Sequence, residues 1–226
     1  MTQEPRQLFR PIGEREIWHT LVSEPGIGVG VVAEDGLILF VNEQAAKMYH
    51  QTEPENMIDR RLDEVFPKEW ADERMRLIRQ VIESGDPMTI RAIWNGRQIR
   101  STLRSIEASD GEPGTKRVLI ISRLGSPGTP ETGEVVETEI VHLGHLDVLT
   151  SKEIEVLALL GQGLRLKEIA ATLHRSPKTI DNHRTSIGRK LKLADRVDLA
   201  QVAADAGLQV RDAQRKRIAS VGASHH

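Results

Sequence analysis

The 226-residue sequence contains no cysteine. This absence excludes disulfide scaffolds, thiolate zinc sites, cysteine nucleophiles and flavin-cysteinyl photochemistry, because each of them needs a sulfur atom. Long apolar runs are also absent, since no stretch approaches the roughly 20 residues that span a bilayer. The first eleven residues are polar and lack the apolar segment of a signal peptide. We therefore expect a cytoplasmic protein that does not enter a membrane.

Recognisable catalytic groups are missing as well. No Ser-His-Asp order, carboxylate pair or phosphate-binding glycine loop stands out. Met48 and His50 are residue types that ligate haem iron, but packing is the simpler interpretation of both. The sequence thus predicts a protein that is not an enzyme, with no catalytic residue, metal site or cofactor.

The formal net charge of −2 is unevenly distributed along the chain. Residues 1–146 carry 17 basic and 24 acidic side chains, a net charge of −7, whereas residues 147–226 carry 14 and 9, a net charge of +5. The two sums return −2. Only the C-terminal part has the sign of charge expected of a segment that approaches phosphate.

A boundary between two domains is indicated by the stretch GSPGTPETG at residues 125–133. It combines Gly, Pro, Ser and Thr without apolar periodicity, which is typical of a linker. We expect an N-terminal domain at 15–123, a linker at 124–146, a C-terminal domain at 147–208 and a basic tail at 209–226. A solvated tail is favoured, and an arm that contacts phosphate is the alternative.

The N-terminal half predicts a β-β-α-α-β-β-β order. Two β-prone runs flank Asp35 and Gly36, a dipeptide suited to a tight hairpin. Helical spacing follows, and then three more strand candidates. The expected ranges are a hairpin at 28–42, helices at 43–50 and 70–84, strands at 88–94, 98–108 and 117–123, and turns at 95–96 and 110–114.

This order and the run VVAEDGLILFVNEQAA at residues 31–46 resemble a PAS domain. The resemblance implies an α+β fold, in which helices lie over a five-stranded antiparallel sheet whose concave face can hold a small molecule. It does not decide whether this chain senses a small molecule or a protein. Haem-binding members generally use a histidine on the longer helix, and residues 70–84 contain none. We expect Phe40, Tyr49 and Trp94 to be core residues.

Four helices are expected in an all-α C-terminal domain. Thr150 and Glu153 form a capping-box pattern at the start of the first helix, which GQG at 161–163 ends. Ser176 is placed to cap the third helix, with Pro177 at its first position. Apolar periodicity predicts the second helix at 166–173, the third at 177–192 and the fourth at 195–206.

The C-terminal pattern is similar to the LuxR-type helix-turn-helix. The matching segments are LTSKEIEVLALL at 149–160, KEIA at 167–170, SPKTIDNH at 176–183, IGRKL at 187–191 and RVDL at 196–199. The family implies that the third helix enters the major groove of DNA. Positions carried over from the family give the candidate DNA contacts Lys167, Lys178, Thr179, Asn182, His183, Thr185, Ser186, Arg189 and Lys190.

Different roles are expected within this set. Asn182 suits a bidentate contact with adenine, whereas Lys178, Arg189 and Lys190 suit phosphate. For His183, packing between helices is slightly favoured over base contact.

Two positions depart from the family pattern. Arg165 stands where the family usually has a small polar residue that caps the second helix. Asp181 stands where many members carry lysine, and a carboxylate there repels phosphate unless it pairs with Arg184 or accepts a hydrogen bond from cytosine.

The sequence as a whole predicts a sequence-specific DNA-binding transcriptional regulator that is controlled by its PAS-like domain. A homodimer on double-stranded DNA is expected, because one recognition helix buries too little surface for typical specific affinity. The alternative is a protein-interaction module that docks a sensor kinase or other regulatory protein and binds DNA only secondarily. A phosphorylated response regulator is disfavoured, because the N-terminal half lacks an alternating βα pattern.

Overall fold

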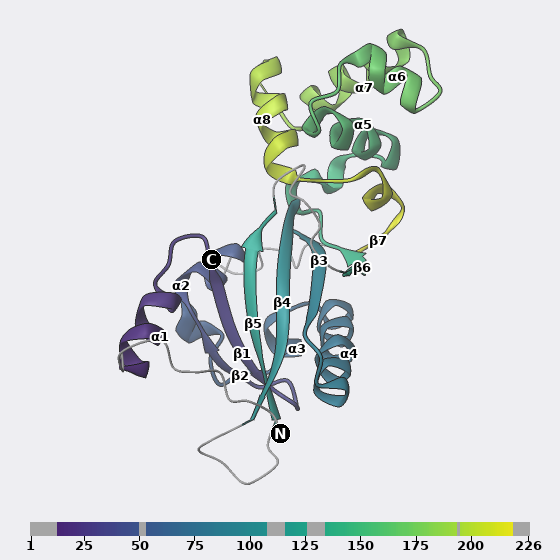
Figure 1. Cartoon of the computed structure of the whole chain (residues 1–226). Helices are drawn as coiled ribbons and strands as arrows, with labels where there is room; N and C mark the ends of the chain where they lie inside the picture. The colour runs from purple at the N-terminus through teal and green to yellow at the C-terminus, as the bar shows by residue number, and fades with distance from the viewer. Residues whose placement is uncertain (1–12, 50–52, 108–115, 126–133, 194, 219–226) are drawn as a thin grey trace, which may run out of the picture.

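The computed structural model of the protein describes residues 13–49, 53–107, 116–125, 134–193 and 195–218. A twisted sheet with helices against it forms one part of the molecule, and a group of helices stands at one end of this sheet (Figure 1). The predicted turn at 110–114, as well as His50, residues 126–133 of the expected linker and residues 219–226 of the expected tail, lie outside the described residues.

Five antiparallel strands form the sheet that the sequence predicted. They are β1 (Gly28–Ala33), β2 (Ile38–Val41), β3 (Met88–Trp94), β4 (Arg97–Glu107) and β5 (Lys116–Leu124). Their order in space is β2-β1-β5-β4-β3, and all four pairings are antiparallel. Gly36 has a φ of 94°, which fits its place in the hairpin turn between β1 and β2.

Two further strands extend this sheet, so the prediction of a five-stranded antiparallel sheet gave too few strands. β6 (Val135–Val141) pairs parallel with β3, and β7 (Lys216–Arg217) pairs parallel with β6. The sheet is therefore mixed and seven-stranded. β6 lies within the range expected to be a linker. Its pairing partner precedes it by about 45 positions in the chain, so the local pattern beside the Gly- and Pro-rich stretch did not reveal it.

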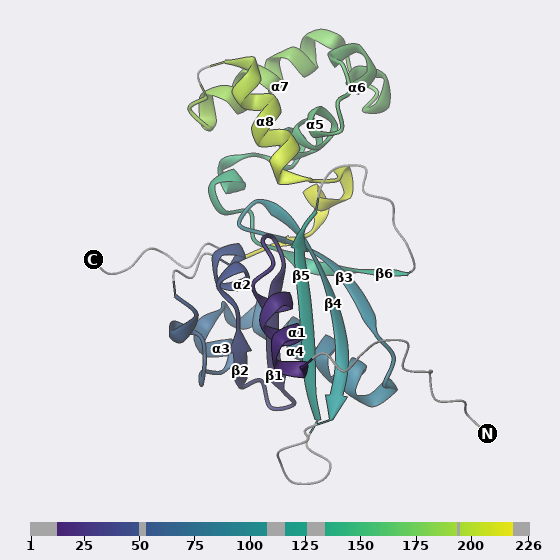
Figure 2. The same cartoon turned by 60° about the vertical axis from the view of Figure 1, so that its left-hand side comes forward.

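The two helices predicted in the N-terminal half are confirmed as α2 (Glu43–Met48) and α4 (Lys68–Ser84). Three elements were not predicted: α1 (Glu14–Val22), the 3₁₀ helix η1 (Pro54–Asn56) and the short α3 (Leu62–Val65). α4 packs on β4, β5 and β6, and its residues Ile78 and Val81 are fully buried. Figure 2 shows α4 and the sheet from a second side.

The four predicted C-terminal helices are confirmed as α5 (Ser151–Gly161), α6 (Leu166–Thr172), α7 (Pro177–Lys190) and α8 (Arg196–Ala206), preceded by the 3₁₀ helix η2 (Gly144–Val148). The capping box is present at the start of α5. The backbone N–H of Thr150 donates to Glu153 at 2.8 Å, and the Thr150 side chain accepts from the backbone N–H of Glu153 at 3.3 Å. Gly207 ends α8 with a φ of 59°.

The two parts of the molecule share apolar packing. Ile93 at the end of β3 and Val141 at the end of β6 belong to the same buried cluster as Leu146 and Leu157 of the helical part. In the opposite direction, Ile218 near the C-terminus lies in the core beneath the sheet. The two parts are therefore packed against each other, and strand β6 lies within the range 124–146 that was expected to be a linker.

The segment expected to be a solvated basic tail is packed over its described residues. Residues Val210–Gln214 form the 3₁₀ helix η3, which lies against α5, and β7 follows it. Asp212, Ala213 and Ile218 are all at least 95% buried. The three arginines of this segment form ion pairs within the protein, for example Arg211 with Glu137 at 2.7 Å. Burial of the apolar side chains of Ala213 and Ile218 favours this packing.

The described residues contain no helix that combines the length and the apolar character needed to cross a membrane.

Candidate nucleic-acid interface

The third helix of the helical part, α7, presents one exposed stripe. Lys178, Asn182, Thr185 and Arg189 are all exposed, and their spacing of four, three and four residues places them on one side of the helix. The opposite side is apolar, because Ile180 and Ile187 are completely buried. Four of the nine predicted DNA contacts are thus brought together on a single solvent-facing surface, which we call the outer face of α7.

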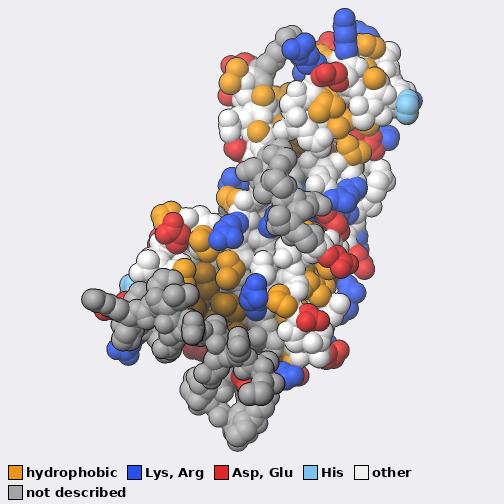
Figure 3. Space-filling view, in the orientation of Figure 1, with side chains coloured by type: hydrophobic (Ala, Val, Ile, Leu, Met, Phe, Trp, Pro, Cys, Tyr) orange, Lys and Arg blue, Asp and Glu red, His pale blue; other side chains and the backbone are white. Residues whose placement is uncertain are grey.

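The electrostatics of α7 suit an anionic partner. Its first turn contains no acidic residue, and the last turn contains Arg189 and Lys190. Its start is well formed, because the Ser176 side chain accepts from the backbone N–H of Thr179 at 3.1 Å and Pro177 occupies the first position. Lys and Arg side chains appear at the end of the helical part that lies farthest from the sheet (Figure 3).

The inner side of α7 is held by a buried carboxylate, Glu153 of α5. The Ser186 hydroxyl donates to its Oε1 at 2.7 Å, and the Lys190 ammonium donates to its Oε2 at 2.6 Å. Burial alone raises the pKa of Glu153, but the hydrogen bonds from Lys190, Thr150 and Ser186 outweigh this effect and lower the pKa to about 2. Two of the predicted DNA contacts, Ser186 and Lys190, therefore point to Glu153.

Thr179 and His183 lie between these two faces. The Thr179 hydroxyl is 2.8 Å from the Ser176 hydroxyl, within the cap of α7. His183 is half-buried and lines a cleft between α5 and α7, where Thr179 and Glu155 also lie. The choice between packing and base contact for His183 stays a prediction.

Both departures from the family pattern find partners in the structure. Asp181 pairs with Arg184 of the same helix at 2.6 Å, so its carboxylate charge is compensated. The backbone N–H of Arg165 donates to Glu168 at 2.6 Å, which caps α6 from inside its first turn. α6 consequently starts at Leu166, as predicted, and Lys167 is exposed at its N-terminal end.

Two residues of this region were not among the predicted site residues. Arg175 is exposed in the turn before α7 and lines the same cleft as Thr179 and His183. A basic residue directly before a helix cap is a signal that the sequence analysis left unused. Glu153 was identified as a capping residue only, because its contacts with Ser186 and Lys190 span 33 and 37 positions and depend on tertiary packing.

The concave face of the sheet is largely filled by aromatic side chains. The rings of Phe66 and Trp70 are 4.2 Å apart, and Tyr49 lies 5.8 Å from Trp70 and 6.0 Å from Trp94. The remaining cavity has a volume of about 60 Å³. Ligand pockets usually measure about 300–1,000 Å³. The core position predicted for Trp94 is confirmed, whereas Tyr49 is partly buried against this core and Phe40 of β2 is only half-buried.

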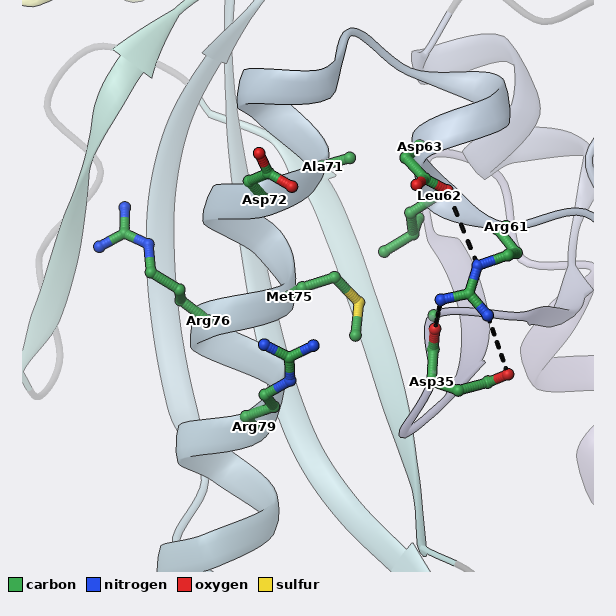
Figure 4. Close-up of a pocket in the computed structure, with 10 residues that line it drawn as sticks. Asp35, Arg61, Leu62, Asp63, Ala71, Asp72, Met75, Arg76 and Arg79 are labelled. Carbon is green, nitrogen blue, oxygen red and sulfur yellow. Dashed lines mark hydrogen bonds and ion pairs between the residues drawn. The ribbon is translucent and has the colours of Figure 1, made fainter.

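A second cleft, of about 320 Å³, lies between the start of α3 and α4 (Figure 4). Arg61 contributes its guanidinium, which is paired with Asp35 at 3.1 Å and with Asp63 at 3.8 Å. On α4, Arg76 pairs with Glu139 at 3.7 Å. Because Arg61 is paired within the cleft and Arg76 and Asp72 are paired with residues outside it, we assign the cleft no ligand. Among the described residues, no group of three His, Asp or Glu side chains is placed to hold a metal ion.

Comparison with known proteins identifies both parts of the chain. Residues 147–203 match the family described as bacterial regulatory proteins, LuxR family, and residues 26–123 match the PAS fold. The helical part is therefore a LuxR-type helix-turn-helix domain, and the sheet part is a PAS domain. The predicted resemblances are confirmed.

Curated relatives match a part of the chain. The chain is 45% identical over 58 residues to the transcriptional regulatory protein UhpA of Escherichia coli, which covers 26% of this chain and 30% of UhpA. It is 31% identical over 123 residues to the transcriptional regulatory protein LiaR of Bacillus subtilis, which covers 53% of this chain and 52% of LiaR. The chain thus spans between three tenths and about half of the length of these relatives.

Solved structures that match the chain include VqmA of Vibrio cholerae. A VqmA dimer without target DNA is 20% identical, with a TM-score of 0.44, over 89% of this chain and 93% of VqmA. A VqmA–ligand–DNA complex is 18% identical, with a TM-score of 0.47, over 85% of this chain and 88% of VqmA. This likeness is too low to transfer a function.

Proposed function

We propose that this protein is a sequence-specific DNA-binding transcriptional regulator in which the PAS domain controls the LuxR-type helix-turn-helix. The observation that carries the proposal is the outer face of α7, where Lys178, Asn182, Thr185 and Arg189 are exposed on one side of a helix whose other side is fixed. A helix with such a polar and basic face fits the major groove of DNA.

The residues of this surface take different roles in the proposal. Asn182 contacts a base edge, because its amide offers a donor and an acceptor to adenine. Lys178 and Arg189, together with Lys167 of α6, contact phosphate. Ser186 and Lys190 act first by fixing α7 on Glu153, since both already donate to that buried carboxylate.

A homodimer is part of the proposal, and α8 is the seam between the two copies. Val197 is 74% exposed, and Ala200 and Ala204 follow at spacings of three and four on the same side of the helix. Small and apolar side chains in this arrangement allow two helices to approach closely. Paired recognition helices double the contacts on a pseudo-palindromic site. A regulator that binds such a DNA site acts in the cytoplasm, which is the location that we propose for this protein.

A second candidate function concerns what the PAS domain recognises. The small cavity at its concave face favours a protein partner, such as a sensor kinase or another regulatory protein, over a small molecule. According to this second candidate function, the PAS domain chiefly docks a protein partner, and DNA binding is secondary.

The proposal is tested by selection of duplexes from a random DNA library with the full-length protein. We expect enrichment of one pseudo-palindromic sequence. The logarithm of the binding constant for this sequence should fall linearly with the logarithm of the salt concentration. Failure to enrich any sequence, together with capture of a protein partner by the PAS domain, would favour the docking module.

A further inference from the structure

A buried ion pair joins the PAS sheet to the C-terminal segment. Arg91 of β3 has a completely buried side chain, and its guanidinium donates to both carboxylate oxygens of Asp212 in η3, at 2.8 and 2.6 Å. The Asp212 side chain is completely buried as well. The Nε–H of Arg91 donates to Gln98 of β4 at 2.7 Å, which fixes the guanidinium in the plane that the bidentate contact requires.

A second carboxylate, Glu137 of β6, completes the arrangement. It accepts from Arg91 at 3.1 Å, pairs with Arg211 at 2.7 Å and also pairs with Arg215. Arg215 in turn lies 3.3 Å from Asp212. Burial, together with the positive charge of Arg91, lowers the pKa of Arg215 to about 10. Two carboxylates between the buried arginines offset this repulsion. We call Arg91, Glu137, Asp212 and Arg215 the clasp.

The clasp reaches the elements that carry the recognition helix. Arg91 also donates to the backbone carbonyl of Gly207, at the end of α8, at 3.4 Å. Gly207 has a left-handed φ of 59°, and a Cβ at this position would lie 3.1 Å from Gln98 of β4. Asp212 lies in η3, which packs on α5, and α5 holds α7 through Glu153. Figure 1 shows β7 and the segment before it between the sheet and the helices.

This segment lies outside the matched family domain, which ends at residue 203. The outer face of α7 stays exposed while the clasp is closed. The clasp thus sets the direction of the recognition helix and does not cover it.

We propose that Arg91 and Asp212 are positioning residues for DNA recognition, which fix the helix-turn-helix at one angle to the β3–β6 edge of the PAS sheet. This inference rests on the proposed function. A partner or ligand that shifts this edge changes the angle, because a buried bidentate pair is satisfied only in a narrow geometry. The spacing of two recognition helices on DNA changes with the angle.

The absence of cysteine allows a direct test by two-site spin labelling. Glu83→Cys on α4 and Ala171→Cys on α6 place labels at exposed positions of the two domains. We expect one narrow distance distribution, which broadens when Arg91→Gln is added. Arg61→Gln is the matched control, because Arg61 pairs with Asp35 and Asp63 inside the PAS domain only. An unchanged distribution in Arg91→Gln overturns the clasp.

If Arg91→Gln loses its far-UV circular dichroism, Arg91→Lys takes its place, because lysine keeps the buried positive charge and loses the bidentate contact with Asp212. The role in recognition is read from duplexes selected by the wild-type protein. We expect the Arg91→Gln protein to bind a duplex with two half-sites roughly tenfold more weakly than the wild-type protein does. Its binding to a single half-site should be unchanged. The duplex with two half-sites is the paired site. Broadened distances with unchanged binding to the paired site overturn the positioning role. If the wild-type protein binds no DNA, the proposed function fails, while the distances still decide the clasp.

Discussion

The two faces of α7 are built from different chemistry. On the inner face, Ile180 and Ile187 are fully buried and Lys190 donates to the buried Glu153. On the outer face, Lys178 and Asn182 are exposed to solvent. The same helix therefore separates stability from recognition. Substitutions on the inner face should change the free energy of unfolding, and those on the outer face should change DNA binding alone.

The largest effect is expected from Ile187→Ala. This side chain is completely buried, so its truncation leaves a cavity and lowers the free energy of unfolding by about 2–5 kcal/mol. Urea denaturation of the full-length protein measures this loss. Thr185→Ala, two residues away on the outer face, is the matched control and should change stability by no more than about 0.5 kcal/mol. Equal losses in both variants would show that the two faces are not distinct.

The next effect concerns Glu153 and acid. Its pKa is lowered from 4.5 to about 2 in the folded protein, so its ionised form stabilises the fold above pH 4.5 and this contribution disappears as the pH falls towards 2. The shift corresponds to something on the order of 3 kcal/mol. Glu153→Gln should lose a comparable amount at neutral pH and should lack this part of the acid dependence. Urea midpoints followed across this pH range check both, and parallel pH profiles for the two proteins would contradict the anchoring role.

A smaller effect, confined to recognition, is expected from Asn182→Ala. Loss of a bidentate amide contact should relax sequence preference at one base pair by about 1–3 kcal/mol. Binding to duplexes mutated one position at a time measures this change. The thermal midpoint should stay at the wild-type value. A uniform loss over all sequences would move Asn182 to the phosphate contacts.

The smallest effect is expected from Lys178→Ala. A lost phosphate contact should weaken binding to every sequence alike and reduce the salt slope by about one. Titrations over a series of salt concentrations check this slope. A loss restricted to one sequence would instead assign Lys178 to a base.

Local patterns predicted the helices and the outer face well. The caps at Thr150 and Ser176 and the apolar period fixed α5 and α7, because these signals lie within a few residues of each other. Family positions supplied Lys178 and Asn182, and helical periodicity explains why they share one side. The exposure of Lys178 and Asn182 could therefore be predicted without knowing any contact between distant segments.

Contacts between segments that are distant in the chain could not be predicted from local sequence patterns. β6 pairs directly with β3, although β4 and β5 lie between them in the sequence. Asp212 binds Arg91, which precedes it by 121 positions. The net charge of the C-terminal segment suggested a solvated tail, because a count of charges does not show that Arg211 and Arg215 pair with Glu137. In the same way, the sequence predicted Lys190 only as a phosphate contact, because its hydrogen bond to Glu153 depends on the packing of α7 on α5.

The central claim is that the outer face of α7 binds DNA while its inner face holds the fold. It is tested most directly by the affinity of the double variant Lys178→Ala/Asn182→Ala for a duplex selected by the wild-type protein. We predict loss of specific binding, with an unchanged urea midpoint and unchanged circular dichroism. Specific binding at the wild-type affinity in this variant would contradict the account.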